Sequence, residues 1–263
     1  MKSKPGYNPI RRNRNIGTPK QGHGQNNKLS IPQPAVTMKT FYERLGEYSR
    51  SEVEINGKRY TFAVEATRRD SQHACSIDDV VRVLEHIPPD DLTGLDLIVF
   101  RQPTRKEELL SSVWGRLIYA YEFENRTCPA IILEAIDYTR QIHWSKHLSV
   151  DDHRELQRLI EDGHQIVDTG RYFEAPYKPA NVRNTQLFRT LLHEIGHYVQ
   201  YMNVVERPAN ANADDIGEWL KRSAYYGSIP TLEKECFAHR YAAEKRKELC
   251  LAGVMPFELP IER

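Results

Sequence analysis

The sequence has few cysteines, and this shortage already excludes two classes of protein. Four cysteines are scattered along 263 residues without a single CxxC pair. Disulfide-stapled domains carry cysteines more densely, and zinc ribbons use closely paired ones. We therefore expect reduced, mostly buried thiols that bind no metal. The cysteines are Cys75, Cys128, Cys236 and Cys250.

Long apolar runs are also missing. No stretch approaches the roughly 20 apolar residues that a membrane-spanning helix needs. The basic N-terminus is not followed by the apolar segment of a secretory signal. These absences predict a cytoplasmic protein with no membrane partner, or one exported by a route that needs no such signal.

Acidic residues are absent before Glu43, although the net charge of the whole chain is only +1. Residues 1–37 are rich in Gly, Asn, Gln, Pro, Lys and Arg and poor in aliphatic side chains. Such a segment buries too little apolar surface to offset its ordering entropy, so we expect a disordered tail. Its positive charge suits nucleic acid or another polyanion, although a solvated tail without a partner is the simpler reading. Residues 38–263 then form one domain.

Within this domain the first half mixes strands with helices and the second half is helical. Asn56-Gly57 between two alternating runs predicts a β-hairpin over 53–62. Ser76 to Asp79 and Ser149 to Asp152 read as capping boxes that open helices. Buried strands are expected over 95–100, 116–123 and 130–136, and 165–179 is expected to be extended and looping. Helices follow over 184–202, 214–222 and 232–251, so the predicted fold class is α+β.

The chemistry centres on His193-Glu194-Ile195-Gly196-His197. Histidines four apart on a helix project from one face, where both can bind one tetrahedral Zn²⁺. Phe188, Leu191, Ile195, Val199 and Met202 form an apolar stripe on the other face. Glycine is unfavourable within a helix, so Gly196 indicates that another segment approaches this backbone closely. Glu194 is expected to act as the general base for a zinc-activated water.

A catalytic zinc site needs a third protein ligand and an open position. Gln200 and Asn203 stand where the metzincin pattern requires Gly and His, which excludes that class. Glu235 is the best candidate, because the small Ala238 and Ala242 on its helical face would let the two helices pack closely. Rivals are Glu233, Asp214 and Asp215, and His239 is either a ligand, a hydrogen-bond partner of the site or a surface residue.

The pairing of the HEXXH motif with Glu235-x-x-Ala238-x-x-Tyr241-Ala242 resembles the gluzincin metallopeptidases. It is similar in particular to the ImmA/IrrE-like peptidases and more weakly to SprT-like proteases, over roughly residues 184–250. The resemblance implies a zincin-like domain with a mixed sheet. It also implies that His193, His197 and Glu235 bind zinc and that Glu194 is the catalytic base.

We therefore expect a zinc metallopeptidase that acts on a protein or peptide. Tyr225 and Tyr226, expected in the loop between the motif helices, are candidate oxyanion donors, with Tyr226 preferred and His239 competing. The strand 130–136 is a candidate edge for substrate, although a core strand is its simpler reading. The alternatives are a zinc-containing regulatory or nucleic-acid-binding module with little catalysis, and a toxin-like or phage-defence peptidase with one target.

Overall fold

The computed structural model describes residues 44–110, 113–210 and 216–254, all within one unit that spans residues 42–263. The predicted tail over 1–37 lies outside the described residues. Among the residues that are described, no helix is long and apolar enough to cross a membrane.

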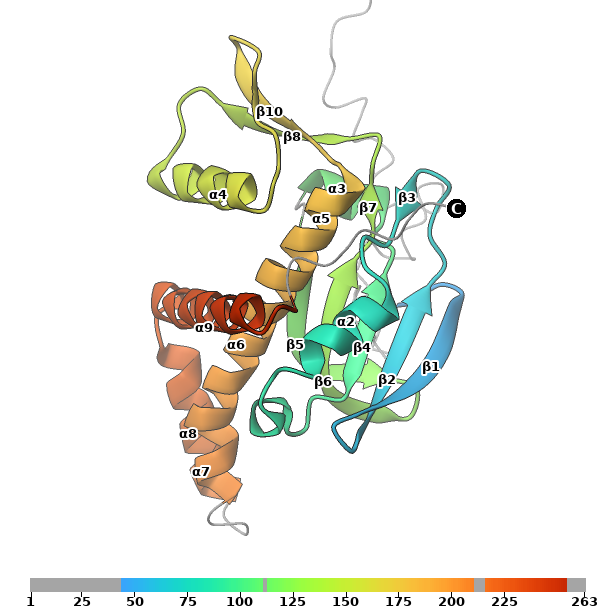
Figure 1. Cartoon of the computed structure of the whole chain (residues 1–263). Coiled ribbons are helices and arrows are strands. Elements are labelled where there is room, and N and C mark those ends of the chain that lie inside the picture. Colours follow the sequence, from blue (N-terminus) through green and yellow to red (C-terminus); the bar gives the residue numbers. More distant parts are fainter. Residues whose placement is uncertain (1–43, 111–112, 211–215, 255–263) are drawn as a thin grey trace, which may run out of the picture. The chain divides into compact units, whose positions relative to one another are not determined.

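A five-stranded mixed sheet runs in the order β1-β2-β4-β6-β5 (Figure 1). Its two outer pairs are antiparallel, whereas the three central strands β2, β4 and β6 run parallel to one another. The sheet and the helices together confirm the predicted α+β class. The strands are β1 (Tyr48–Ile55), β2 (Lys58–Glu65), β4 (Leu97–Arg101), β5 (Gly115–Phe123) and β6 (Arg126–Glu134).

The hairpin between β1 and β2 is confirmed. Asn56 and Gly57 have φ angles of 50° and 77°, the left-handed values that a tight hairpin turn requires. Both capping boxes are also confirmed, at the N-termini of α2 (Ile77–Leu84) and α4 (Val150–Glu161). The local sequence signals therefore predicted the turn between β1 and β2 and the N-termini of α2 and α4 correctly.

The helix that carries the HEXXH motif is longer than expected. Its helical turns begin at Pro179 rather than at 184 and continue past Met202. Proline suits the first turn of a helix, where its missing N–H has no partner in any case. The segments are α5 (Pro179–Thr185), the π-helical η5 (Gln186–Leu191), α6 (Leu192–Tyr201), the π-helical η6 (Met202–Glu206) and α7 (Arg207–Asn210).

Two further helices follow, α8 (Ile216–Ser228) and α9 (Thr231–Leu251). The second agrees closely with prediction. The first extends six residues beyond the predicted end at 222, so Tyr225 and Tyr226 lie on a helix and the expectation of a loop is wrong. Apolar contacts of Tyr226 with the sheet outweigh the weak local helix signal there. Asp214 and Asp215 lie outside the described residues.

Smaller elements complete the fold. A three-stranded sheet in the order β8-β10-β9 was not predicted as such: β8 was missed, and β9 and β10 fall in the segment expected to be extended. Their bounds are Gln141–Ser145, Val167–Asp168 and Tyr172–Pro176 for β8, β9 and β10; Ser71–Gln72 and Ile136–Asp137 for the paired strands β3 and β7; Arg105–Leu110 for α3; and Pro89–Leu92 for the 3₁₀ helix η4.

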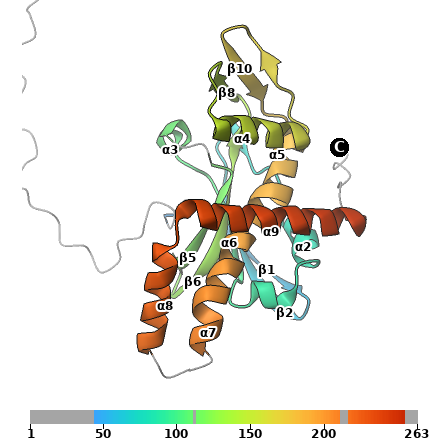
Figure 2. The same cartoon turned by 90° about the vertical axis from the view of Figure 1, so that its left-hand side faces the viewer.

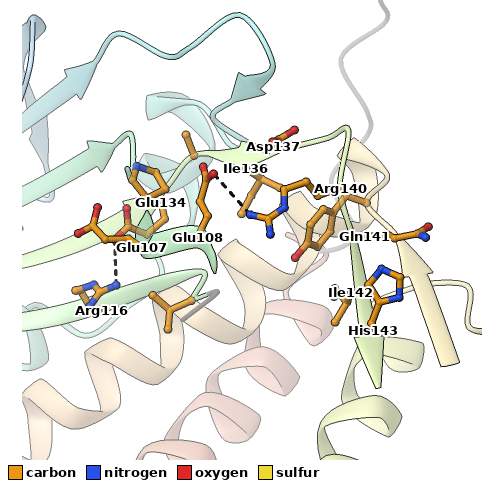
Figure 3. Close-up of a pocket in the computed structure, with 14 residues that line it drawn as sticks. Glu107, Glu108, Arg116, Glu134, Ile136, Asp137, Arg140, Gln141, Ile142 and His143 are labelled. Atoms are coloured by element: carbon orange, nitrogen blue, oxygen red, sulfur yellow. Dashed lines mark ion pairs between the residues drawn. The ribbon is translucent and has the colours of Figure 1, made fainter. Parts of the chain in front are cut away.

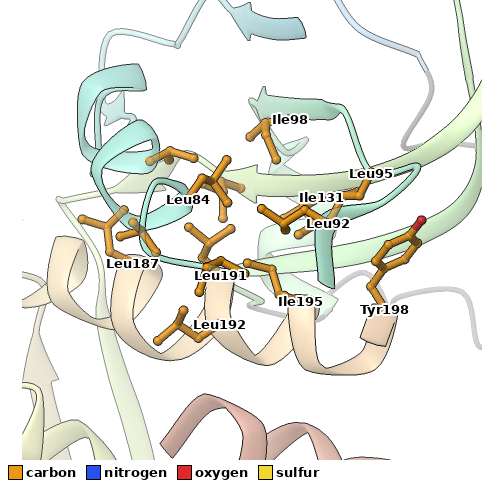
Figure 4. Close-up of a cluster of buried hydrophobic side chains, with 14 of the residues drawn as sticks. Leu84, Leu92, Leu95, Ile98, Ile131, Leu187, Leu191, Leu192, Ile195 and Tyr198 are labelled. Carbon is orange, nitrogen blue, oxygen red and sulfur yellow. The ribbon is translucent and has the colours of Figure 1, made fainter. Parts of the chain in front are cut away.

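The core lies between one face of the large sheet and the helices α2 and η5-α6 (Figure 4). Ile98 and Ile131 of the sheet meet Leu84, Leu191 and Ile195, and all five are fully buried. Alternating residues of the same strands form a second buried cluster, as the two-residue period of a strand requires. The predicted apolar stripe, Phe188 to Met202, is buried throughout. The HEXXH helix is thus fixed to the sheet by the side opposite its histidines.

The four cysteines are free, as predicted, but they are not mostly buried. Cys75 is buried, Cys128 is half-buried, and Cys236 and Cys250 on α9 are exposed. Both exposed thiols lie on the outer face of a helix whose inner face packs on α6.

Candidate metal centre

The approach predicted for the backbone at Gly196 is present, and the approaching segment is α9, which crosses α6 (Figure 2). A Cβ atom at position 196 would lie 2.9 Å from Ala238 Cα and 3.0 Å from the Ala238 carbonyl oxygen. Ala238 and Ala242 are both buried, as expected for small residues at a close helix crossing. Glycine and alanine together therefore bring the two helices close enough to share a site.

Three side chains converge at this crossing. His193 Nε2 lies 3.0 Å from His197 Nε2 and 3.2 Å from Glu235 Oε2, and His197 Nε2 lies 3.5 Å from Glu235 Oε1. Two of the donors come from α6 and the third from α9. The structure thus brings together the three residues that the sequence singles out as ligands.

The spacing of these atoms suits a tetrahedral zinc ion. Zinc binds imidazole nitrogen and carboxylate oxygen at about 2.0–2.2 Å, so the edges of its coordination tetrahedron are about 3.4 Å long. The two imidazole nitrogens are 3.0 Å apart, and they lie 3.2 and 3.5 Å from different oxygens of Glu235, all close to that value. Two imidazoles and one carboxylate are also a ligand set that catalytic zinc sites use.

The electrostatics favour metal over protons at the two histidines. Burial and the neighbouring His197 lower the pKa of His193 to about 3, and burial also lowers the pKa of His197, although Glu235 opposes the shift. Both imidazoles are therefore neutral at pH 7. A neutral nitrogen has the free lone pair that a metal requires, so no proton has to be displaced.

A third imidazole lies at the same crossing. The His239 ring centroid is 4.5 Å from that of His193, and His193, Glu235 and His239 offer ligand atoms within 4.8 Å of one another. We prefer His197 to His239 as the second nitrogen ligand, because its contacts with both partners are 3.5 Å or shorter. His239 is the candidate for a fourth ligand, and four protein ligands would close the site to water.

Glu194 lies beside these ligands and is held from the sheet. Its Oε2 accepts a 2.8 Å hydrogen bond from the backbone N–H of Leu117 on β5. Burial raises the pKa of Glu194 to about 7; the Leu117 hydrogen bond opposes the shift, and the charge of Glu235 adds to it. A carboxyl group whose pKa is close to neutral can both take up and release a proton, as a general base must.

Glu194, His197 and Glu235 line a cleft of about 310 Å³ together with Tyr119 and Tyr226. The two tyrosine hydroxyls lie 2.9 Å apart, and either can donate to the other. When Tyr119 donates, the Tyr226 proton is free for a substrate oxygen. Tyr225, the other candidate, is 62% exposed and does not line this cleft.

Two members of this cleft had no signal in the sequence. Tyr119 reads as an ordinary strand residue, and the Leu117 N–H that holds Glu194 is a backbone group 77 residues away in the chain. Of the rival ligands, Glu233 is exposed on α9 and belongs to no group of potential ligands among the described residues.

The edge predicted for substrate binding is not the one that the structure provides. Strand β6, which contains most of 130–136, is hydrogen-bonded to β4 on one side and to β5 on the other. It therefore has no free edge, and its simpler reading as a core strand is confirmed. Strand β5 is the edge strand beside the cleft, and Leu117 directs its N–H away from β6 towards Glu194.

A second pocket, of about 330 Å³, is lined by paired charges (Figure 3). Glu134 on β6 accepts hydrogen bonds from Arg101 at 3.0 and 3.2 Å and pairs with Arg116 at 3.2 Å. Arg101 also pairs with Glu107, at 2.8 Å. Because its central carboxylate is compensated by two arginines, this pocket lacks the donor set of the metal centre.

Comparison of the chain with family models, curated proteins and solved structures finds no match.

Proposed function

We propose that the protein is a zinc-dependent metallopeptidase with a zincin-like fold, in which His193, His197 and Glu235 hold Zn²⁺. The observation that carries the proposal is the convergence of two imidazole nitrogens and the Glu235 carboxylate at 3.0–3.5 Å, with the carboxyl group of Glu194, whose pKa is raised, between the two histidines in the sequence. The mixed sheet, with an antiparallel edge strand beside the cleft, supports the same assignment.

Each side chain of the cleft has its own role in the proposed hydrolysis. Zinc in such a site acts as a Lewis acid towards water and carbonyl oxygen. Glu194 takes the proton of the attacking water and returns it to the departing amine as the peptide C–N bond breaks. Tyr226 donates a hydrogen bond to the carbonyl oxygen as negative charge develops on it. The free edge of β5 gives an extended peptide a strand to pair with.

The competing proposal, a zinc-containing module without catalysis, is favoured by one observation, the nearness of His239 to His193. If His239 is a fourth ligand, no position is left for water. The basic segment 1–37 would then supply contact with nucleic acid.

Zinc content decides between these readings. We expect one zinc per chain in wild type and His239→Ala, and its loss in His193→Ala and Glu235→Gln. Glu233→Gln, which makes the same chemical change two residues away on the exposed face of α9, is the matched control and should keep the metal. Loss of zinc in His239→Ala would establish the closed site of a module. A wild-type protein that is folded but binds no zinc would end both readings.

A further inference from the structure

A third cavity, separate from the charged pocket around Glu134, shares lining residues with the metal cleft. It encloses about 730 Å³, more than twice the 310 Å³ of the cleft. Tyr119 and Tyr226 line both. A peptide whose scissile bond lies in the cleft would therefore place a neighbouring side chain at the mouth of this larger pocket.

Five of the residues that line this pocket are aromatic. Tyr119 and Tyr201 have ring centroids 4.5 Å apart, and Tyr201 and Tyr226 have centroids 5.4 Å apart. Tyr198 and Trp219 complete the aromatic lining. Such rings contribute large apolar contact areas and favour a further ring in an offset or edge-to-face arrangement.

The polar atoms of these rings already have partners. Tyr201 Oη and Trp219 Nε1 donate to the same Glu206 oxygen, at 2.8 and 2.9 Å. Tyr198 Oη donates to the Thr93 carbonyl at 2.5 Å, and the remaining two hydroxyls pair with each other. Four of the five ring donors are therefore already satisfied, and the fifth, the Tyr226 proton, is the one assigned to the substrate carbonyl in the metal cleft. These rings thus offer an occupant of the pocket apolar contact rather than further hydrogen-bond donors.

Building on the peptidase function above, we propose that this pocket receives an aromatic side chain of the substrate residue next to the scissile bond. Its volume lies within the range typical of pockets that enclose small organic groups, and it is ample for phenylalanine or tryptophan. The substrate class is thus a peptide with Phe, Tyr or Trp flanking the bond that is cleaved.

The pocket also offers a direct probe of its own occupancy, because Trp219 forms part of its wall. Zinc-loaded protein would be titrated with N-acetyl-phenylalaninamide, N-acetyl-alaninamide and N-acetyl-argininamide. The signal is the change in tryptophan fluorescence that disappears in Trp219→Phe. We expect saturable binding of the phenylalanine amide alone.

A pair of variants on α8 sharpens the test. Ser223 lines the pocket and is half-buried, whereas the next residue, Ala224, is exposed and does not line it. Ser223→Phe fills the space and should weaken binding of the phenylalanine amide by at least about 10-fold. Ala224→Phe adds the same ring outside the pocket and should leave binding unchanged.

Cleavage of matched peptides that carry Phe, Ala or Arg beside one bond completes the experiment. The Phe peptide should be cleaved with at least about 10-fold higher kcat/KM than the Ala peptide, and Ser223→Phe should remove this preference. Cleavage without preference, together with no binding of the amide, overturns the pocket assignment and leaves the peptidase function standing. A preference for Arg also overturns it, in favour of recognition by Glu206. Binding of the amide without cleavage of any peptide overturns the peptidase function and retains an aromatic-binding pocket.

Discussion

Two glutamates, the buried Glu134 and the half-buried Glu194, have sharply different surroundings in this fold. Burial raises the pKa of both carboxyl groups. Two arginines pair with Glu134: Arg101 donates hydrogen bonds of 3.0 and 3.2 Å to it, and Arg116 lies 3.2 Å away. One backbone N–H holds Glu194, and the nearby Glu235 opposes its charge. The ion-paired Glu134 stabilises the structure. Glu194, whose pKa is about 7, can exchange a proton near neutral pH.

The largest effect is expected from Glu194→Gln. The amide oxygen can still accept the Leu117 hydrogen bond, but it cannot take a proton from water. Peptide cleavage should fall on the order of 10³-fold, while zinc content and the free energy of unfolding change little. Kinetics on zinc-loaded protein with a cleavable peptide would check this, and activity near the wild-type level would refute the assigned role.

The same substitution at the other carboxylate, Glu134→Gln, should act on stability instead. It leaves Arg101 and Arg116 without their shared buried anion, which should cost about 3 kcal/mol in the free energy of unfolding. Urea denaturation gives the measurement. If this variant instead loses activity per folded molecule as severely as the Glu194 variant, the contrast between the two sites is wrong.

Gly196→Ala tests the helix crossing on which the metal centre depends. The new methyl group meets the Ala238 backbone at 2.9 Å, which should lower the free energy of unfolding by about 2 kcal/mol and weaken zinc binding. Gly227→Ala on α8 is the matched control, because no atom lies within 4 Å of its new Cβ. That variant should gain up to about 1 kcal/mol from its helix propensity.

Tyr226→Phe probes the one uncharged group assigned to catalysis in the cleft. Loss of the hydroxyl should lower kcat by about 10-fold or more and leave KM and zinc content unchanged, because the hydroxyl acts on charge that develops in the transition state. Tyr225→Phe removes the same atom from a largely exposed side chain and serves as control. Equal kinetics for the two variants would remove Tyr226 from the mechanism.

Arg116 links the two glutamates, since it pairs with Glu134 and its charge lowers the pKa of Glu194. Arg116→Gln should cost about 1 kcal/mol of stability, because Arg101 remains to compensate Glu134. Arg126→Gln removes a more exposed pair with Asp96 and should cost less. Thermal unfolding of both variants at one pH gives the comparison.

The features that could be predicted from sequence are those encoded by neighbouring residues. The Asn56-Gly57 turn, the two capping boxes and the spacing of His193 and His197 each depend on a few adjacent positions. Glu235 was accessible because alanines one and two turns further along its helix mark a close crossing. The β8-β10-β9 sheet was not predicted, since its strands are only two to five residues long and give too short a pattern to recognise.

Features that depend on residues far apart in the chain could not be predicted from the sequence in this way. That β5 rather than β6 forms the edge follows from strand pairing across the whole sheet. The Leu117 N–H is present in any residue except proline, so its role as a partner of Glu194 cannot be read from residue types. The aromatic pocket likewise draws its rings from β5, α6 and α8, which meet only in the folded chain.

The division of the metal ligands between two helices has a consequence for synthesis. Glu235 follows His197 by 38 positions, so a ribosome that has completed the HEXXH helix has not yet made the third ligand. The emerging chain therefore carries only a two-histidine half-site, which gives zinc an incomplete coordination sphere. Under the proposed function, activity would therefore require α9 to leave the ribosome and dock at Gly196. A nascent chain without α9 would then be unable to cleave neighbouring chains on the polysome.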